Sequence, residues 1–288
     1  IEAVHPVNEK SQAQTRIPGE PGIWAFVAGD LLVFSLFFIL IAIGNQEQGD
    51  VFSSARSTLD LRFGLVNTLL LLTGSFFVAI GVERYRLNDG LDNRIWFRLA
   101  ILSGVIFLIN KVFEWNAKVS GGLTPMTNDF YMYFFVFTAI HAIHVFVGIV
   151  ILSFLHNKSQ APFTPETQRG LESGAIFWHL VDLLWIMLFA LFYIGVIFMS
   201  HSKQIIGLSL MTWAWFVLVA VTMFAWWLAE GEQKMAGATT TAIFLTACVK
   251  IWVIGYQFME LKLAPAFLRY GFLLWLIVIS CILVFLIS

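Results

Sequence analysis

Charged residues are scarce in this sequence: only 12% of the 288 residues are Asp, Glu, Lys or Arg, whereas 59% are hydrophobic. In soluble domains about a quarter of the residues are charged, so the composition excludes an ordinary soluble protein and indicates a membrane protein. The formal net charge of −1 gives no sign of a nucleic-acid-binding surface. We therefore expect membrane lipids, and no nucleic acid, among its partners.

Cysteine is almost absent as well. Cys248 and Cys281 both lie within apolar runs, and neither belongs to a CxxC motif or to a set with zinc-ligand spacing. We expect them to be small core residues and not a disulfide. Residues 1–21 form a polar N-terminal tail that does not have the pattern of a cleavable signal peptide.

Long apolar runs, by contrast, are abundant. A membrane-spanning helix needs about 20 predominantly apolar residues, and a spanning segment must satisfy its own backbone hydrogen bonds, which favours helices. The expected fold class is all-α: a polytopic membrane helical bundle of about eight transmembrane helices. The expected spans are 22–44, 64–84, 96–116, 129–155, 174–199, 208–229, 237–260 and 266–287.

The distribution of Lys and Arg predicts the orientation of this multi-pass chain. Short cytoplasmic loops carry an excess of these residues. If the N-terminus is cytoplasmic, the excess falls on the cytoplasmic side and is concentrated in the four arginines between residues 84 and 98. We therefore expect the N-terminus in the cytoplasm.

A few ionisable residues interrupt the apolar runs, where each is costly and normally faces protein or water. Three pairs share an i, i+3 spacing, which places both members on one face of a helix: Lys111 and Glu114, His141 and His144, and His179 and Asp182. We expect Asp30, His144, His179 and Asp182 at one depth, since each residue adds about 1.5 Å to a helix. His141 lies half a turn above this layer, and a separate ion pair lies near the outer surface. The expected network comprises Asp30, Lys111, Glu114, His141, His144, His179 and Asp182.

Three interpretations of this network remain open. Interhelical hydrogen bonds can fix the packing of helices, and carboxylates and imidazoles in series can relay protons. Histidines facing each other from two helices can also hold a haem, for which His141 or His144 with His179 are candidates. A metal site wants three or four convergent ligands. The spacing gives only weak support for a metal, and we predict no catalytic, cofactor-binding or metal-ligating residue.

Four segments carry a resemblance to a known family. They are "GIWAFVAGDLLVFSLFF", "NTLLLLTGSFF", "FTAIHAIHVFVGIVIL" and "FWHLVDLLWIMLFALFYIG", and they resemble successive helices of subunit III of the haem–copper oxidases. Over residues 22–200 the chain looks like the five-helix short form of that family, and most like NorE-type accessory proteins of nitric oxide reductase. It departs from the family at Asp30, where a glutamate is usual, and at Lys111, where a neutral polar residue is expected. The residues that match the family are Asn67, Thr68, Glu114, His141, His144, Gly148, Trp178, His179, Asp182 and Trp185.

The C-terminal part resembles a different family. The segment "FLTACVKIWVIGYQFMELKLAPAFLR" is similar to prokaryotic subunit IV proteins, including NorF-type proteins. The chain is therefore predicted to be a fusion of a five-helix unit (22–200), a linker (201–207) and a three-helix unit (208–288).

The resemblance implies a function without catalysis. Subunit III carries no haem or copper, packs against the catalytic subunit and holds lipid. We therefore expect an accessory subunit of a terminal oxidase or nitric oxide reductase in a bacterial inner membrane, with no cofactor of its own apart from bound phospholipid. The alternative is a small b-type cytochrome or a proton-coupled carrier that acts alone.

Two kinds of surface follow from this expectation. We expect lipid to bind in a cleft lined by three phenylalanines and next to an arginine cluster that suits anionic headgroups. Lys250 lies deep within its span, so it must either meet an acceptor or snorkel to the headgroups. The expected lipid-binding residues are Phe34, Phe37, Phe38, Arg84, Arg86, Arg94 and Arg98, and the expected subunit contacts are Trp178, Trp185, Lys250 and Glu260.

Overall fold

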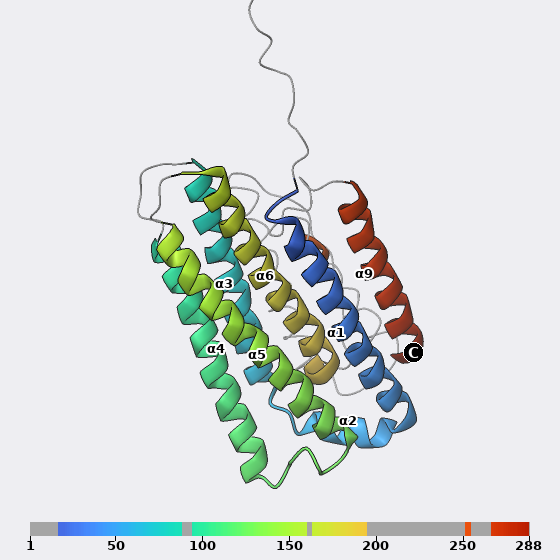
Figure 1. Ribbon diagram of the computed structural model, residues 1–288. Helices are drawn as coiled ribbons and strands as arrows, with labels where there is room; N and C mark the ends of the chain where they lie inside the picture. Colours follow the sequence, from blue (N-terminus) through green and yellow to red (C-terminus); the bar gives the residue numbers. More distant parts are fainter. Residues whose placement is uncertain (1–16, 88–93, 160–162, 195–250, 255–265, 288) are drawn as a thin grey trace, which may run out of the picture.

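A computed structural model of the chain describes residues 17–87, 94–159, 163–194, 251–254 and 266–287 (Figure 1). The described residues form helices joined by short turns, with no strand among them, which confirms the expected all-α membrane bundle. The helices are α1 (Pro21–Glu47), α2 (Gly49–Ser57), α3 (Leu61–Leu87), α4 (Arg94–Ser120), α5 (Asp129–Lys158), α6 (Pro165–Phe189), the π-helix η1 (Ala190–Ile194) and α9 (Ala266–Ile287).

Among the residues that the structure describes, five helices are long and apolar enough to cross a membrane: α1, α3, α4, α5 and α6 continued by η1. They correspond to the first five expected spans. The eighth expected span, 266–287, coincides with α9. The expected spans 208–229 and 237–260 lie outside the described residues, apart from the short helical stretch 251–254.

Two features of the helix ends differ from expectation. The fifth span begins at Pro165 instead of at residue 174, because Thr164 caps the helix by accepting a hydrogen bond from the Thr167 amide at 3.1 Å. The proline that follows suits the first turn of a helix. The segment after α1, between the expected spans 22–44 and 64–84, forms the helix α2, whose buried Phe52 packs edge-on against Phe130 of α5 at 5.4 Å.

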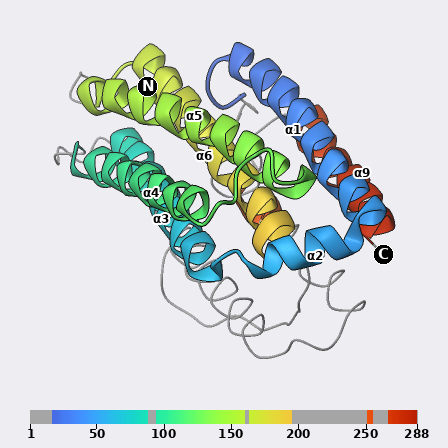
Figure 2. The same cartoon turned by 90° about the horizontal axis from the view of Figure 1, so that it is seen from below.

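Helix α6 lies at the centre of the bundle. It contacts α1, α3 and α5, and the end-on view shows these helices around it (Figure 2). From Gly174 to Phe189 every residue of α6 is buried. A helix that is apolar all round is typical of a span enclosed by other helices. Helix α6 is therefore the central helix of the five-helix unit.

One side chain of α6 shows how close this packing is. The ring of Trp178 lies against glycines of three other helices, Gly74 on α3, Gly104 on α4 and Gly148 on α5. A β-carbon added at these glycines would lie 3.1, 2.8 and 2.9 Å from the ring. Small residues at membrane helix interfaces allow such close approach, and here they make room for one tryptophan at a junction of four helices.

This packing predicts opposite effects for two glycine substitutions. Gly104→Ala should destabilise the protein by about 1–3 kcal/mol, because its β-carbon would overlap Trp178 in a filled core. Gly29→Ala on α1 has no neighbour within 4 Å and should be neutral or stabilising by up to about 1 kcal/mol, since alanine favours helix. Thermal unfolding in detergent measures both. Equal shifts for the two variants would contradict the proposed role of the Trp178 junction.

The C-terminal helix α9 packs against α1; the two run side by side in Figure 1, and α9 lies behind α1 in Figure 2. Phe272, Leu276 and Ile279 of α9 are buried. Cys281 is exposed on this helix, so the expectation that it is a core residue is wrong.

Candidate functional site

Asp30 of α1 and His144 of α5 form a pair across the α1–α5 contact. His144 Nε2 lies 3.2 Å from Asp30 Oδ1, and His144 Nδ1 lies 2.8 Å from the Ile140 carbonyl oxygen. A carbonyl can only accept, so Nδ1 carries a hydrogen. The contact at Nε2 is then favourable only if a proton lies between the imidazole and the carboxyl group. The pair therefore holds one exchangeable proton.

The surroundings of this pair are largely apolar. The side chains of His144 and Asp30 are 20% and 11% exposed, and Phe34 meets the imidazole edge-on at 5.5 Å. Further along the same contact, Phe37 of α1 stacks on Phe137 of α5 at 4.4 Å. The polar pair and the stacked rings together join α1 to α5.

The shared proton can be tested by spectroscopy. We expect a wild-type spectrum with either a protonated imidazole at His144 or a protonated carboxyl group at Asp30, because a neutral imidazole beside an ionised carboxylate lacks the bridging proton. Infrared difference spectra of Asp30→Asn against wild type, with ¹⁵N-histidine NMR, detect both forms. The combination of an ionised Asp30 and a neutral His144 would contradict the inference.

A second polar cluster consists of Lys111, Glu114 and Tyr193. Lys111 Nζ donates to Glu114 Oε2 at 2.8 Å and to the Tyr193 hydroxyl oxygen at 2.9 Å. That hydroxyl donates in turn to Glu114 Oε1 at 2.6 Å. The three groups thus close a ring of hydrogen bonds in which the carboxylate uses both oxygens. The structure forms the ion pair that the i, i+3 spacing predicts.

Protein surrounds this cluster on all sides. The Lys111 and Glu114 side chains are each 1% exposed, and the ammonium group lies over the rings of Phe134 and Trp185 at 4.6 and 5.2 Å. A cation over an aromatic face is stabilised by the ring quadrupole. The unusual lysine is therefore accommodated by one carboxylate, one phenol and aromatic faces.

The cluster predicts that single and double substitutions differ. Lys111→Met should destabilise by about 3–5 kcal/mol, because it leaves a buried carboxylate without its counter-ion. Adding Glu114→Gln removes that charge and should recover at least half of the loss. Melting temperatures of the two single variants and the double variant in detergent measure this. A double variant as unstable as the sum of the singles would show that the ion pair is not the source of the effect.

The remaining members of the expected network are completely buried. His141 lies between Phe107 and Trp185, with ring-centre distances of 5.7 and 5.3 Å, and His179 and Asp182 have no exposed surface on α6. The sequence analysis expects His144 at one depth with His179 and Asp182; in the structure its two nitrogens lie against the Ile140 carbonyl oxygen and Asp30. The printed hydrogen bonds of the network form an Asp30–His144 pair and a Lys111–Glu114–Tyr193 cluster.

The arrangement of these groups bears on metal ligation. Within the described segments, no three His, Cys, Asp or Glu side chains converge in a way that could hold a metal ion.

The sequence analysis missed a buried carboxylate at the start of α6. Glu172 accepts hydrogen bonds from Arg86 Nη2 at 2.8 Å, from Gln168 Nε2 at 2.7 Å and from the Gly19 amide at 2.9 Å. Gly19 has a φ of +70°, which favours glycine. The carboxylate ties the end of α3 and the segment before α1 to α6. Its i, i+4 spacing from Gln168 is a signal that could have been noticed.

Several expected surface contacts are corrected by the structure. Trp178 and Trp185 are 1% and 0% exposed, so they are core residues and not subunit contacts; Trp185 Nε1 donates to Thr68 Oγ1 at 3.0 Å. Phe34 and Phe38 have no exposed surface and cannot line a lipid cleft, which leaves only Phe37 partly exposed. Lys250 and Glu260 lie outside the described residues.

The four arginines are also placed differently from one another. Arg86 binds Glu172, so its guanidinium group is engaged within the protein. Arg84 lies over the ring of Trp96 at 5.3 Å. Arg94 is partly exposed and Arg98 is exposed at the same end of the bundle. Of the four arginines, Arg98 is the one whose side chain is exposed.

Comparison with known proteins agrees with this architecture. Residues 20–197 match the family model of cytochrome c oxidase subunit III, and residues 212–284 match that of prokaryotic cytochrome c oxidase subunit IV. The first match spans most of the chain and includes the five membrane-spanning helices. The chain belongs to the cytochrome c oxidase subunit III family, with a subunit IV-like part at its C-terminal end.

Relatives of the first part include subunits of both cytochrome and quinol oxidases. Cytochrome c oxidase subunit 3 of Thermostichus vulcanus is 30% identical over 177 residues, which cover 60% of this chain and 85% of that protein. Cytochrome c oxidase subunit 3 of a Synechocystis strain is 33% identical, covering 60% and 74%. Quinol oxidase subunit 3 of Bacillus subtilis is 28% identical, covering 58% and 82%.

Proposed function

We propose that this protein is a non-catalytic accessory subunit of a membrane haem–copper oxidoreductase, in which it packs against and stabilises the catalytic subunit. The observation that carries the proposal is the subunit III match over all five spans. The geometry supports it, because the ionisable groups are engaged with one another or enclosed within the bundle. Such an arrangement suits a protein that supports a partner.

The partner that we propose is the catalytic subunit of a terminal oxidase or of a nitric oxide reductase. The names of the relatives, which include both cytochrome c and quinol oxidase subunits, support the oxidase. The NorE-like pattern of the sequence supports the nitric oxide reductase. In either case the haem and copper chemistry would reside in the partner.

The proposed setting is a bacterial inner membrane with the N-terminus in the cytoplasm. In that orientation the exposed Arg98 lies on the cytoplasmic side, where anionic headgroups attract basic residues. We propose that phospholipid binds there. The site is smaller than the sequence alone suggested, since Arg86 is engaged with Glu172.

The alternative of a small b-type cytochrome receives little support from the geometry. Two axial histidines must face a common haem from different helices. His144 already binds Asp30 and Ile140, and His141 is packed between two aromatic rings. The nitrogens of His144 are therefore already engaged, and the faces of the His141 ring are turned to aromatic side chains.

The proposal predicts the outcome of one purification. The tagged chain, extracted from its native membrane in mild detergent, should carry a haem-containing catalytic subunit, which mass spectrometry identifies. After dissociation in a harsher detergent, the chain itself should show no Soret band. A stoichiometric Soret band in the isolated chain, or the absence of any haem protein in the first eluate, would overturn the proposal.

A further inference from the structure

The segment before α1 is fastened to the first part of α6. The Gly19 amide donates to Glu172 Oε2 at 2.9 Å, and the Glu20 amide donates to Ser173 Oγ at 2.8 Å. Gly19 has a φ of +70°, and a β-carbon added there would lie 2.9 Å from Ser173 Oγ. Glycine alone adopts this conformation and allows this approach without strain. Residues 17–20 with Glu172 and Ser173 are called the clasp below.

The carboxylate of the clasp is held in place from other positions. Arg86 at the end of α3 donates to Glu172 Oε1 at 2.8 Å, and Gln168 Nε2 donates to the same oxygen at 2.7 Å. The Glu172 side chain is 2% exposed. Charge-assisted hydrogen bonds of this kind are short, strong and directional. The clasp therefore has a defined position relative to α3 and α6.

The clasp is also joined to α1. Trp24 Nε1 donates to the Pro18 carbonyl oxygen at 2.9 Å, which links residues 17–20 to the beginning of the helix. The helix begins at Pro21 and continues without interruption past Asp30. Asp30 lies about 14 Å from that start, at a rise of about 1.5 Å per residue. A displacement of the clasp along the helix axis would therefore move Asp30 with it.

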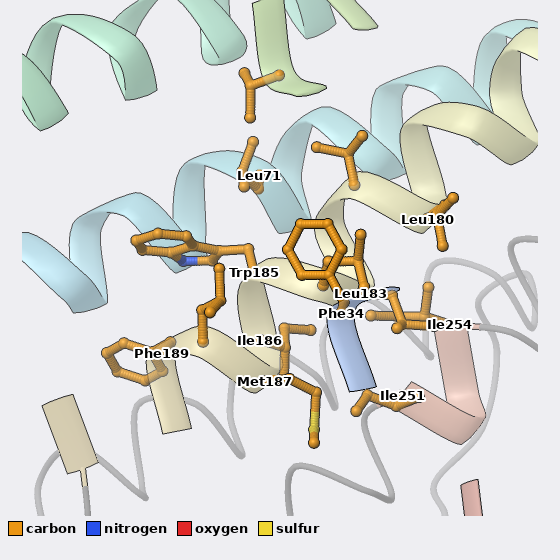
Figure 3. Close-up of a cluster of buried hydrophobic side chains, with 14 of the residues drawn as sticks. Phe34, Leu71, Leu180, Leu183, Trp185, Ile186, Met187, Phe189, Ile251 and Ile254 are labelled. Atoms are coloured by element: carbon orange, nitrogen blue, oxygen red, sulfur yellow. The ribbon is translucent and has the colours of Figure 1, made fainter. Parts of the chain in front are cut away.

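Much of the contact between α1 and α6 is apolar. Trp24, Val27 and Leu31 are buried, and Phe34 belongs to the same hydrophobic cluster as Leu183 of α6. Figure 3 shows these last two side chains within that cluster. In lipid, apolar area gives little driving force between helices, and packing and hydrogen bonds decide how they associate. The directional hydrogen bonds of the clasp can therefore set the height of α1, which apolar area does not.

The Asp30–His144 pair depends on that height. His144 Nε2 lies 3.2 Å from Asp30 Oδ1, at the upper end of the usual range for a hydrogen bond. The His144 ring is fixed on its own helix, because its Nδ1 donates to the Ile140 carbonyl oxygen at 2.8 Å. The ring therefore cannot follow a displaced partner. A shift of α1 along its axis by a fraction of a turn would lengthen the contact beyond hydrogen-bond distance.

We propose that Glu172 is a positioning residue for the Asp30–His144 pair: through residues 17–20 it sets the height of α1 and keeps the carboxyl group within reach of the imidazole. The clasp at the end of the bundle and the pair within it are coupled by one helix. Release of residues 17–20 would separate the pair without any change at Asp30 or His144 themselves. This coupling does not depend on which partner the protein binds.

Two variants open the clasp from opposite sides. Glu172→Gln keeps the size of the side chain but removes its charge and one of its two acceptor oxygens. Gly19→Ala places a β-carbon against the clasp at a positive φ. In the full chain in detergent, both should lower the population of the bridged pair about threefold or more, as expected for the loss of a hydrogen bond. The ¹⁵N signals of His144 and the infrared band of Asp30 measure this population.

Each variant has a matched control. Glu166→Gln makes the same change at an exposed side chain of α6. Gly22→Ala adds a β-carbon to α1 at a position where no atom of the described residues lies within 4 Å. Neither control should change the signals of the pair. Ser173→Ala, which removes one hydrogen bond of the clasp, replaces Gly19→Ala if that variant does not fold, and it should change the signals in the same direction by a smaller amount.

Thermodynamic linkage supplies a second test. If the clasp stabilises the pair, the pair must stabilise the clasp by the same free energy. Asp30→Leu, which removes the pair, should therefore speed hydrogen exchange at the Gly19 and Glu20 amides about threefold or more, since exchange reports local opening. Asp50→Leu, at an exposed position of α2, is the control and should leave this exchange unchanged. Mass spectrometry of the intact, exchanged protein after digestion measures both.

Two outcomes would overturn the proposal. In the first, Glu172→Gln and Gly19→Ala lower the melting temperature while the signals of His144 and Asp30 remain those of the wild type, which would show that the clasp only stabilises the fold. In the second, Asp30→Leu leaves exchange at the Gly19 amide unchanged, which would show that the clasp and the pair are not coupled.

Discussion

Ionisable side chains in the apolar spans must find partners inside the protein, and this constraint governs the structure. Lipid offers no hydrogen bonds to a lysine, a carboxylate or an imidazole. Lys111 accordingly bonds to Glu114 and Tyr193, and Asp30 bonds to His144. The first set of hydrogen bonds joins α4 to η1, and the second joins α1 to α5. The hydrogen bonds of the polar groups therefore also fix how these elements are placed.

Close helix packing complements the polar pairs. Hydrophobic burial does not distinguish one helix from another in lipid, so the specificity comes from shape. Trp178 fits against three glycines of three helices, and Glu172 ties the ends of α3 and α6 together. The central helix α6 thereby becomes the common support for the first unit, and it also contributes to the core shared with Ile251 and Ile254.

These features are consistent with the proposed role as an accessory subunit. The Asp30–His144 pair joins two helices and is partly exposed at the surface of the bundle, whereas the Lys111–Glu114 ion pair is buried. Helix α9 packs against α1, which carries Asp30.

The sequence by itself determined the fold class, five of the spans and the helix at 266–287, because an apolar run of membrane length leaves the backbone no alternative to a helix. It also predicted the Lys111–Glu114 pair, whose members are one turn apart on one helix. Only the tertiary structure decided which helices face each other. In the tertiary structure His144 bonds to Asp30 and not to Asp182, and Tyr193 bonds to Lys111 across 82 positions of sequence. Trp178 and Trp185 point into the core. Such contacts depend on the rotation and relative height of separate helices, which the residues of any one helix do not specify.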